Sequence, residues 1–350
     1  MNHVAIDLGG RESQICVRGG DGQILQEERR PTLGLQRYLA TLEPARVVLE
    51  TCAEAFMVAE WARSAGHHVT VVPASLVRAL GVGSRGIKND VRDARNLSEA
   101  SCRMQQLPSV HIPRAASREL KSLCTLRDSL VTSRTKLINS ARGWLRGQAI
   151  GRVKPGSADS FTQRLRALWR QKTGGDLAPA LQRHALSIDV LTEQMLAAEQ
   201  ELQDFARADA TCRRLMTVPG VGPLVAVRFF CSIDDVSRFS SAHALQSYIG
   251  LTPGEDSSSD KRRPTGITKA GTPRVRWLLQ QAAWVAWRFY KNDPIVQWAE
   301  GVAQRRGRKI AATALARKLA GIMFAVWRDG TAYQRTRATH DSTETAEVAA

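Results

Sequence analysis

Cysteine is scarce in this chain of 350 residues: there are six, and no two of them form a Cys-x-x-Cys pair. Because a zinc site or a disulfide framework needs closely spaced or paired cysteines, we expect neither. The N-terminus, MNHVAIDLGG, lacks the features of a signal peptide, and no apolar run reaches the length of a membrane span. These absences predict a cytoplasmic protein with reduced thiols and no membrane partner.

Acidic residues are also in short supply, with 33 Asp and Glu against 50 Lys and Arg, which gives a formal net charge of +17. An excess of this size favours a polyanionic partner, and nucleic acid is the usual one. A generally basic protein without such a partner is the alternative. The hydrophobic fraction, 43%, is ordinary for a globular protein.

Short β-branched runs alternate with helical stretches over the first part of the chain. The run His-Val-Ala-Ile-Asp-Leu at residues 3–8 is typical of a buried strand. The alternation predicts an α/β domain over residues 1–112. The expected strands are 3–8, 13–18, 23–27, 46–50 and 68–72, and the expected helices are 32–42, 56–65 and 75–80.

From about Pro113 the pattern changes to the periodicity of helices. Two long amphipathic stretches, at 116–145 and 179–204, predict a helical coiled-coil arm within residues 113–210. Two packed helices of a single chain, without a partner chain, are the alternative.

Helical patterns continue over residues 211–332 and predict a mainly α C-terminal domain. Within it, the tryptophans recur at helical spacing and are expected in the core: Trp277, Trp284 and Trp287. The segment 254–266 is polar, has no apolar anchor and is expected to form a loop. The polar tail, 333–350, is expected to be disordered.

Two carboxylates, Asp90 and Asp93, stand three residues apart at the start of an expected helix. Side chains at i and i+3 share a helix face. Two acids on one face, ringed by Lys88, Arg92 and Arg95, are costly unless a divalent or polyanionic group binds among them. The local alternative is that Asp90 caps the helix and Asp93 pairs with a neighbouring arginine.

Two further acids, Asp7 and Glu50, end expected strands, and strand ends and helix starts converge at one edge of an α/β sheet. Four carboxylates there would repel one another unless they held divalent cations. Mg²⁺, or Mn²⁺ in its place, suits such oxygen ligands, and a pair of ions can clamp both reacting oxygens of a phosphodiester. The candidate catalytic metal site is therefore Asp7, Glu50, Asp90 and Asp93.

The opening Ala5-Ile-Asp-Leu-Gly-Gly10 also resembles the start of actin-like sugar kinases, whose glycine turn faces a phosphate. Such a kinase requires further glycine-rich phosphate and adenosine motifs, and none stands on a matching strand. The helical second half and the charge of +17 also argue against a small-molecule kinase.

Three consecutive serines, Ser257 to Ser259, stand in the polar loop just before three basic residues. A serine hydroxyl is a poor nucleophile until it is activated, and nearby cations stabilise charge that develops on a phosphate. A solvated linker is the alternative. The candidate nucleic-acid contacts are Lys88, Arg92, Lys261, Arg262, Arg263, Lys269, Arg274 and Arg276.

Five segments, taken together, resemble the DEDD transposases of the one-ten-type insertion-sequence family, which includes the Piv DNA invertase. One of these segments, the turn Val218-Pro-Gly-Val-Gly, also resembles a helix-hairpin-helix motif. The alternative is that this turn is a packing corner between two helices. The segments are Ala5-Ile-Asp-Leu, Val48-Leu-Glu-Thr, Lys88-Asn-Asp-Val-Arg-Asp-Ala-Arg, that turn, and the stretch from Arg238 through Gly250-Leu-Thr-Pro to Ile267-Thr-Lys-Ala-Gly.

The resemblance implies a RuvC-like, RNase H-type N-terminal domain, the coiled-coil arm and a C-terminal transposase domain. It places the four acids in the family's metal-binding tetrad. It also implies a serine nucleophile that becomes covalently joined to DNA through its phosphate, and Ser258 is the best match. Family members usually have Gly after this serine, where the chain has Ser259, so Ser257 and Ser259 stay open as alternatives.

The resemblance further implies target and donor DNA, a structured guide (bridge) RNA and a homo-oligomer, either a dimer or a tetramer. A rival interpretation is a metal-dependent nuclease or Holliday-junction resolvase that uses water, which would need the acids but not the serines. A second rival is a nucleic-acid-binding protein with a decayed acid site. It would bind unchanged after Asp7 or Asp90 became Asn, and it would never cut.

Overall fold

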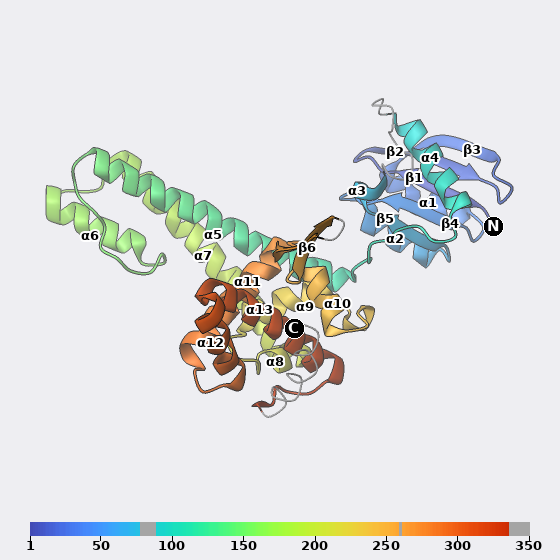
Figure 1. Cartoon of the computed structure of the whole chain (residues 1–350). Coiled ribbons are helices and arrows are strands. Elements are labelled where there is room, and N and C mark those ends of the chain that lie inside the picture. Colours follow the sequence, from blue (N-terminus) through green and yellow to red (C-terminus); the bar gives the residue numbers. More distant parts are fainter. Residues whose placement is uncertain (78–88, 259–260, 336–350) are drawn as a thin grey trace. The chain divides into compact units, whose positions relative to one another are not determined.

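The structure is a computed structural model of the whole chain, and it describes residues 1–77, 89–258 and 261–335, with 255–258 and 261–264 described by their backbone. Contacts divide the chain into two compact units, Met1–Arg114 and Ala115–Ala350. The first unit contains a mixed sheet with helices, and the second is mainly helical (Figure 1).

A five-stranded sheet in the order β3-β2-β1-β4-β5 forms the centre of the first unit. β1, β4 and β5 run parallel, whereas β2 and β3 form an antiparallel meander beside β1. The predicted mixed α/β character of this region is confirmed. The strands are β1 (His3–Asp7), β2 (Glu12–Arg18), β3 (Ile24–Pro31), β4 (Arg46–Glu50) and β5 (His68–Val72).

Helices cover both faces of this sheet. α1 and α2 pack on one face against Ile6 and Leu49, and α4 packs on the other face against Ala5 and Val48. Because successive side chains of a strand point to opposite faces, a strand covered on both sides needs apolar residues throughout, as β1 and β4 have. The helices are α1 (Leu35–Thr41), α2 (Ala55–Ser64), α3 (Ala74–Val77) and α4 (Asp90–Arg103), with the 3₁₀ turn η1 (Thr32–Gly34).

Two long helices of the second unit, α5 (Ala115–Gly147) and α7 (Pro179–Ala208), lie side by side in Figure 1. They run antiparallel, because Ser140 contacts His184 near the far end of the pair. α6 (Phe161–Thr173) packs at that end, where it shares a small core with α5 and α7. The arm is thus a pair of helices from one chain, and its pairing with a second chain stays a prediction.

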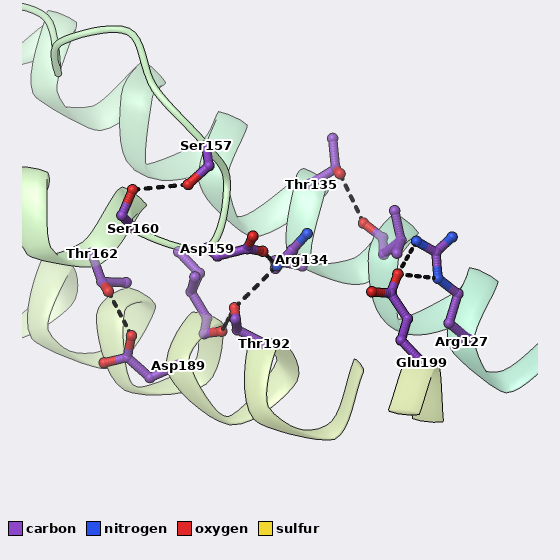
Figure 2. A network of polar contacts seen from close by, with 12 residues as sticks. Arg127, Arg134, Thr135, Ser157, Asp159, Ser160, Thr162, Asp189, Thr192 and Glu199 are labelled. Atoms are coloured by element: carbon purple, nitrogen blue, oxygen red, sulfur yellow. Dashed lines mark hydrogen bonds and ion pairs between the residues drawn. The ribbon is translucent and has the colours of Figure 1, made fainter. Parts of the chain in front are cut away.

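Polar contacts also join α5 to α7 and to the loop before α6 (Figure 2). Arg134, whose exposed fraction is 7%, donates to Asp159 Oδ1 at 2.5 Å and to Thr192 Oγ1 at 3.4 Å. Arg127 Nε donates to Glu199 Oε1 at 2.8 Å. A slip of α7 along α5 would separate the half-buried Arg127 guanidinium from the Glu199 carboxylate, so this contact favours a single register of α5 against α7.

The remaining helices of the second unit enclose a larger core that includes Phe229, Leu279 and Phe324. The sequence did not predict α12, although its start has two ordinary signals: the Asp293 side chain accepts from Ile295 N at 3.1 Å, and proline follows Asp293. The elements are α8 (Ala210–Leu215), α9 (Pro223–Ile233), η3 (Val236–Arg238), α10 (Ala242–Ile249), α11 (Pro273–Phe289), α12 (Pro294–Arg306) and α13 (Arg308–Asp329).

Two expectations for this unit are wrong. The segment 254–266, expected as a loop, forms most of an antiparallel hairpin of β6 (Pro253–Ser258) and β7 (Lys261–Ile267). Trp277 and Trp284, expected in the core, are 47% and 41% exposed. Periodicity identifies the residues that share a helix face, but it does not reveal whether another element covers that face.

The turn before α9 is a packing corner. Gly220 has a φ of +79°, and a Cβ there would lie 2.1 Å from the carbonyl oxygen of Ala282 in α11. Only glycine combines this backbone conformation with so close an approach. The packing alternative therefore accounts for the Val218-Pro-Gly-Val-Gly turn.

By length and composition alone, helix α13 is long and apolar enough to cross a membrane, with a mean hydropathy of 1.4. The expectation that no apolar run reaches the length of a membrane span is therefore wrong. Half of the apolar stretch of α13 is buried inside the protein. Leu319 and Phe324 lie in the core of the second unit, and a core helix meets the same criteria.

Candidate functional site

Two acids end neighbouring parallel strands at one edge of the sheet. Ile6 of β1 pairs with Leu49 of β4, so the next residues, Asp7 and Glu50, end their strands side by side. Both residues are half-buried. The carboxyl ends of parallel strands are where α/β folds place their ligands, so this edge is a natural position for a site.

Helix α4 begins at the same edge. Arg29 Nη2 lies 4.0 Å from Asp90 Oδ2. Arg29 pairs with Gln14 across the sheet, and Gln14 pairs in turn with Asp7. The first turn of α4 is therefore level with the carboxyl end of β1.

The other end of α4 lies at the opposite edge of the sheet. Ser101 Oγ is 2.8 Å from His3 Nδ1 at the start of β1, and Arg46 Nη1 donates to the Met104 carbonyl at 2.8 Å at the start of β4. α4 thus runs antiparallel to both strands. This direction brings its two acids to the edge where the two strand-end acids lie.

Asn89, and not Asp90, caps α4, because its side-chain oxygen accepts from the backbone N–H of Val91 at 3.0 Å. Arg95 is engaged with Glu27, at 2.5 Å, and this ion pair lowers the pKa of Glu27. The local explanation for Asp90 as a cap is therefore wrong. Both acids in this first turn gain instead from the positive end of the helix dipole.

The chemistry of this edge suits a divalent cation, because its carboxylates are hard oxygen donors and its backbone arrangement brings them to one side. Within residues 1–77, 89–258 and 261–335, however, no three His, Cys, Asp or Glu side chains are grouped closely enough to hold a metal ion. The assignment of Asp7, Glu50, Asp90 and Asp93 as metal ligands stays a prediction.

The turn that follows Asp7 is held rigidly. A Cβ on Gly9 would lie 2.3 Å from the Glu12 carbonyl oxygen, so this close turn requires glycine. The buried Ser13 and Thr32 hydroxyls are 2.8 Å apart, and Thr32 Oγ1 donates to the Gly9 carbonyl at 2.6 Å. These contacts fix the direction in which β1 ends.

Sequence reasoning missed Arg29, which the structure places beside the acid edge. Its guanidinium lies 3.2 Å from Glu12 and 4.0 Å from Asp90, and its side chain is 60% exposed. An exposed cation next to the candidate site is well placed to meet a phosphate. The sequence offered no signal for it, because its neighbours on β3 are similar charged residues.

Two of the candidate serines, Ser257 and Ser258, lie on the β6–β7 hairpin of the second unit. In the backbone register Ser257 pairs with Arg262, and Ser258 with Lys261. Antiparallel pairing therefore sets basic residues directly across from the two serines along the chain. Ser259 lies outside the described residues.

The predicted nucleic-acid contacts have different surroundings. Arg92 and Lys269 are exposed, and Lys269 has a φ of +57°. Arg274 Nη2 donates to Asp128 Oδ1 at 2.5 Å, and Arg276 Nη1 donates to the Ile249 carbonyl at 2.9 Å. These two guanidinium groups already hold the protein's own elements together, whereas Lys88 lies outside the described residues.

Comparison with known proteins gives this arrangement a context. The family described as "Transposase IS116/IS110/IS902 family" matches residues 212–297, and a second, DEDD-type transposase family of the IS110 group matches residues 4–149. The transposase for insertion sequence element IS1111A from Coxiella burnetii is 30% identical over 331 residues, covering 92% of this chain and 88% of the relative. The chain belongs to the IS110 family of insertion-sequence transposases.

Other transposases match over similar lengths. The transposase for insertion sequence element IS1328 from Yersinia enterocolitica is 29% identical over 341 residues, which are 95% of this chain and 98% of the relative. A probable family 20 transposase from Pseudomonas aeruginosa is 25% identical over 338 residues. The resemblance to the one-ten-type family is thus confirmed, and the match over residues 4–149 includes all four candidate acids of this IS110-family chain.

Proposed function

We propose that this IS110-family transposase exchanges DNA strands through a covalent phosphoserine intermediate, guided by a structured RNA. The observation that carries the proposal is the shared edge of the sheet, where the ends of β1 and β4 meet the first turn of α4. The strand order of the sheet supports a RuvC-like, RNase H-type domain as its framework.

The acids have one role in this proposal. A divalent ion, Mg²⁺ or Mn²⁺, bound by Asp7, Glu50, Asp90 and Asp93 would supply positive charge beside the scissile phosphate. The Gly9 turn and the Asn89 cap hold the backbone on either side of these carboxylates. Arg29, at the same edge, would contact a phosphate oxygen and orient the strand.

Ser258 has the second role. Its Oγ attacks the phosphorus in line, a serine–phosphate bond forms, and the bond from phosphorus to the 3′-oxygen breaks. The serine hydroxyl gives up its proton, and the departing 3′-oxygen gains one. A 3′-hydroxyl of another strand then attacks the phosphoserine and releases the serine, so the exchange needs no ATP.

The partners follow from this chemistry. Target and donor DNA supply the two strands, and a guide RNA would select them by base pairing. The net charge of +17 supports polyanionic partners without distinguishing DNA from RNA. Since the acids and the serine belong to different compact units, we propose a homo-oligomer in which each subunit can complete the site of another.

The test is a strand-exchange assay with DNA that carries the ends of the encoding element, together with the RNA that co-purifies with the full-length protein. Ser258→Ala should abolish both the exchanged product and the covalent protein–DNA adduct seen on a denaturing gel. Ser257→Ala is the matched control and should retain both. Persistence of the adduct in Ser258→Ala would show that this serine assignment is wrong.

The same assay separates the proposal from the water-using nuclease. If water is the nucleophile, Ser257→Ala, Ser258→Ala and Ser259→Ala each cut DNA at the wild-type rate, and none of them forms an adduct. Asp7→Asn should stop cutting under either mechanism, whereas a decayed binding protein would not cut even before the change.

A further inference from the structure

A pocket of about 670 Å³ lies among α11, α12 and the start of α13, and none of its lining residues belongs to the serine hairpin. Trp284 and Trp287 of α11 line it, with Glu300 of α12 opposite. Trp284 is 41% exposed. The pocket therefore presents indole surface to whatever enters it.

The two indoles form a defined platform. Their ring centroids are 5.9 Å apart and their planes are inclined by 26°, a stacked arrangement. Trp287 Nε1 donates to Glu300 Oε2 at 2.9 Å, which fixes the orientation of that ring. A planar group that entered the pocket would meet an aromatic face held in place, so little ordering entropy would be lost on binding.

The walls of this pocket are cationic. Arg288, Lys291 and Arg308 line it beside its apolar residues, and they outnumber the one carboxylate of the lining, Glu300, which accepts from Trp287. Arg305, which is exposed near the end of α12, adds another positive charge to this region of the second unit. An apolar helix or a lipid chain docked here would bury these cations without partners, which is costly, whereas a phosphate would neutralise them.

We propose that this pocket, which we call the tryptophan pocket, binds one unpaired nucleotide of a single-stranded nucleic acid. The base stacks on the exposed face of Trp284, and its phosphate contacts Arg288 and Arg308. Stacking of this kind accepts any base and requires it to be out of a duplex. The inference rests on the proposed function only in taking nucleic acid as the partner, and it assigns no step of the reaction to this pocket.

The test uses short oligonucleotides that carry a single 2-aminopurine, whose fluorescence is quenched when the base stacks on an indole. The full-length protein should quench the probe in a single strand and leave it unchanged in the matching duplex. Trp284→Ala should weaken single-strand binding about tenfold and remove the quenching, because one base–aromatic stack contributes on this scale. Trp284→Phe should restore most of the binding.

Trp277→Ala is the matched control, since Trp277 is on the same helix, is 47% exposed and does not line the tryptophan pocket. It should bind the probe as tightly as the wild type. DNA and RNA versions of the probe identify which strand is the source, and quenching of either supports the proposal. Equal quenching of the probe in single strand and duplex, or quenching that survives Trp284→Ala, would overturn it.

The readout separates this inference from the proposed function. The oligonucleotides need no cleavable site, so the binding experiment can be carried out in the Asp7→Asn background. If Ser258→Ala still exchanged strands while Trp284→Ala lost the quenching, the serine mechanism would fail and the tryptophan pocket would stand. If Ser258→Ala lost strand exchange while Trp284→Ala kept the quenching, the serine mechanism would stand and only the tryptophan pocket would be rejected.

Discussion

At the scale of single residues, the acid edge depends on a few side chains that do not themselves belong to the candidate site. Asn89 caps the beginning of α4, so that Asp90 and Asp93 fall in its first turn. Gly9 permits the turn after Asp7, and the Ser13–Thr32 contact holds it. The sequence predicted the acids as candidates, whereas the residues that support them were identified only from contacts between distant segments of the chain.

Asn89→Ala should lower the free energy of unfolding by about 1 kcal/mol, because the helix loses its capping oxygen. Urea unfolding of the full-length protein, followed by circular dichroism, measures this change. Asn89→Asp retains an acceptor oxygen and should differ little from the wild type. If the alanine variant were as stable as the aspartate variant, the cap would not be what holds this end of α4.

Arg29→Ala should reduce strand exchange several-fold, because the exposed guanidinium beside Asp90 would no longer meet a phosphate. The purified variant should unfold at the wild-type urea concentration, since exposed ion pairs contribute little to stability. Arg30→Ala is the neighbouring control, because Arg30 pairs with Glu28 instead. Equal losses in the two variants would remove Arg29 from the site.

At the scale of elements, the sequence predicted best where a local pattern coincided with burial. β1 and β4 were predicted because a strand covered on both faces must be apolar throughout. The β6–β7 hairpin was missed because its polar residues show no alternation, and backbone pairing leaves no trace in such a segment. The exposure of Trp284 was missed because periodicity does not reveal whether a neighbouring element covers a helix face.

The direction of α4 shows the same limit. Spacing predicted that Asp90 and Asp93 share one helix face, but the position of that face depends on contacts such as Ser101 with His3, far apart in sequence. The convergence of the strand ends, by contrast, could be predicted, because parallel strands joined by helices end at one edge. The chemistry of the site was therefore more predictable than its support.

Gly220→Ala should lower the free energy of unfolding by at least about 2 kcal/mol, because a Cβ would collide with the Ala282 carbonyl at a positive φ. Gly222→Ala is the matched control, two residues further on, where a Cβ meets nothing within 4 Å. The midpoints of urea unfolding compare the two variants. Similar midpoints would contradict the packing corner between this turn and α11.

At the scale of the whole molecule, the acids and the serine hairpin belong to separate compact units of the chain. The proposed oligomer predicts that two inactive variants can complement each other. Mixing Asp7→Asn with Ser258→Ala should restore part of the strand exchange that each variant lacks alone, if subunits share sites. A mixture as inactive as its components, although the subunits exchange, would show that each subunit must supply both parts.

The central claim is that a serine of the chain, and not water, breaks the DNA strand. The most direct measurement is mass spectrometry of the proteolysed covalent adduct formed by the wild-type protein on DNA that carries the element's ends. The account predicts a phosphonucleotide on the peptide that contains Ser258, with fragmentation that places it on that residue. Cleaved DNA without any modified peptide would contradict the claim.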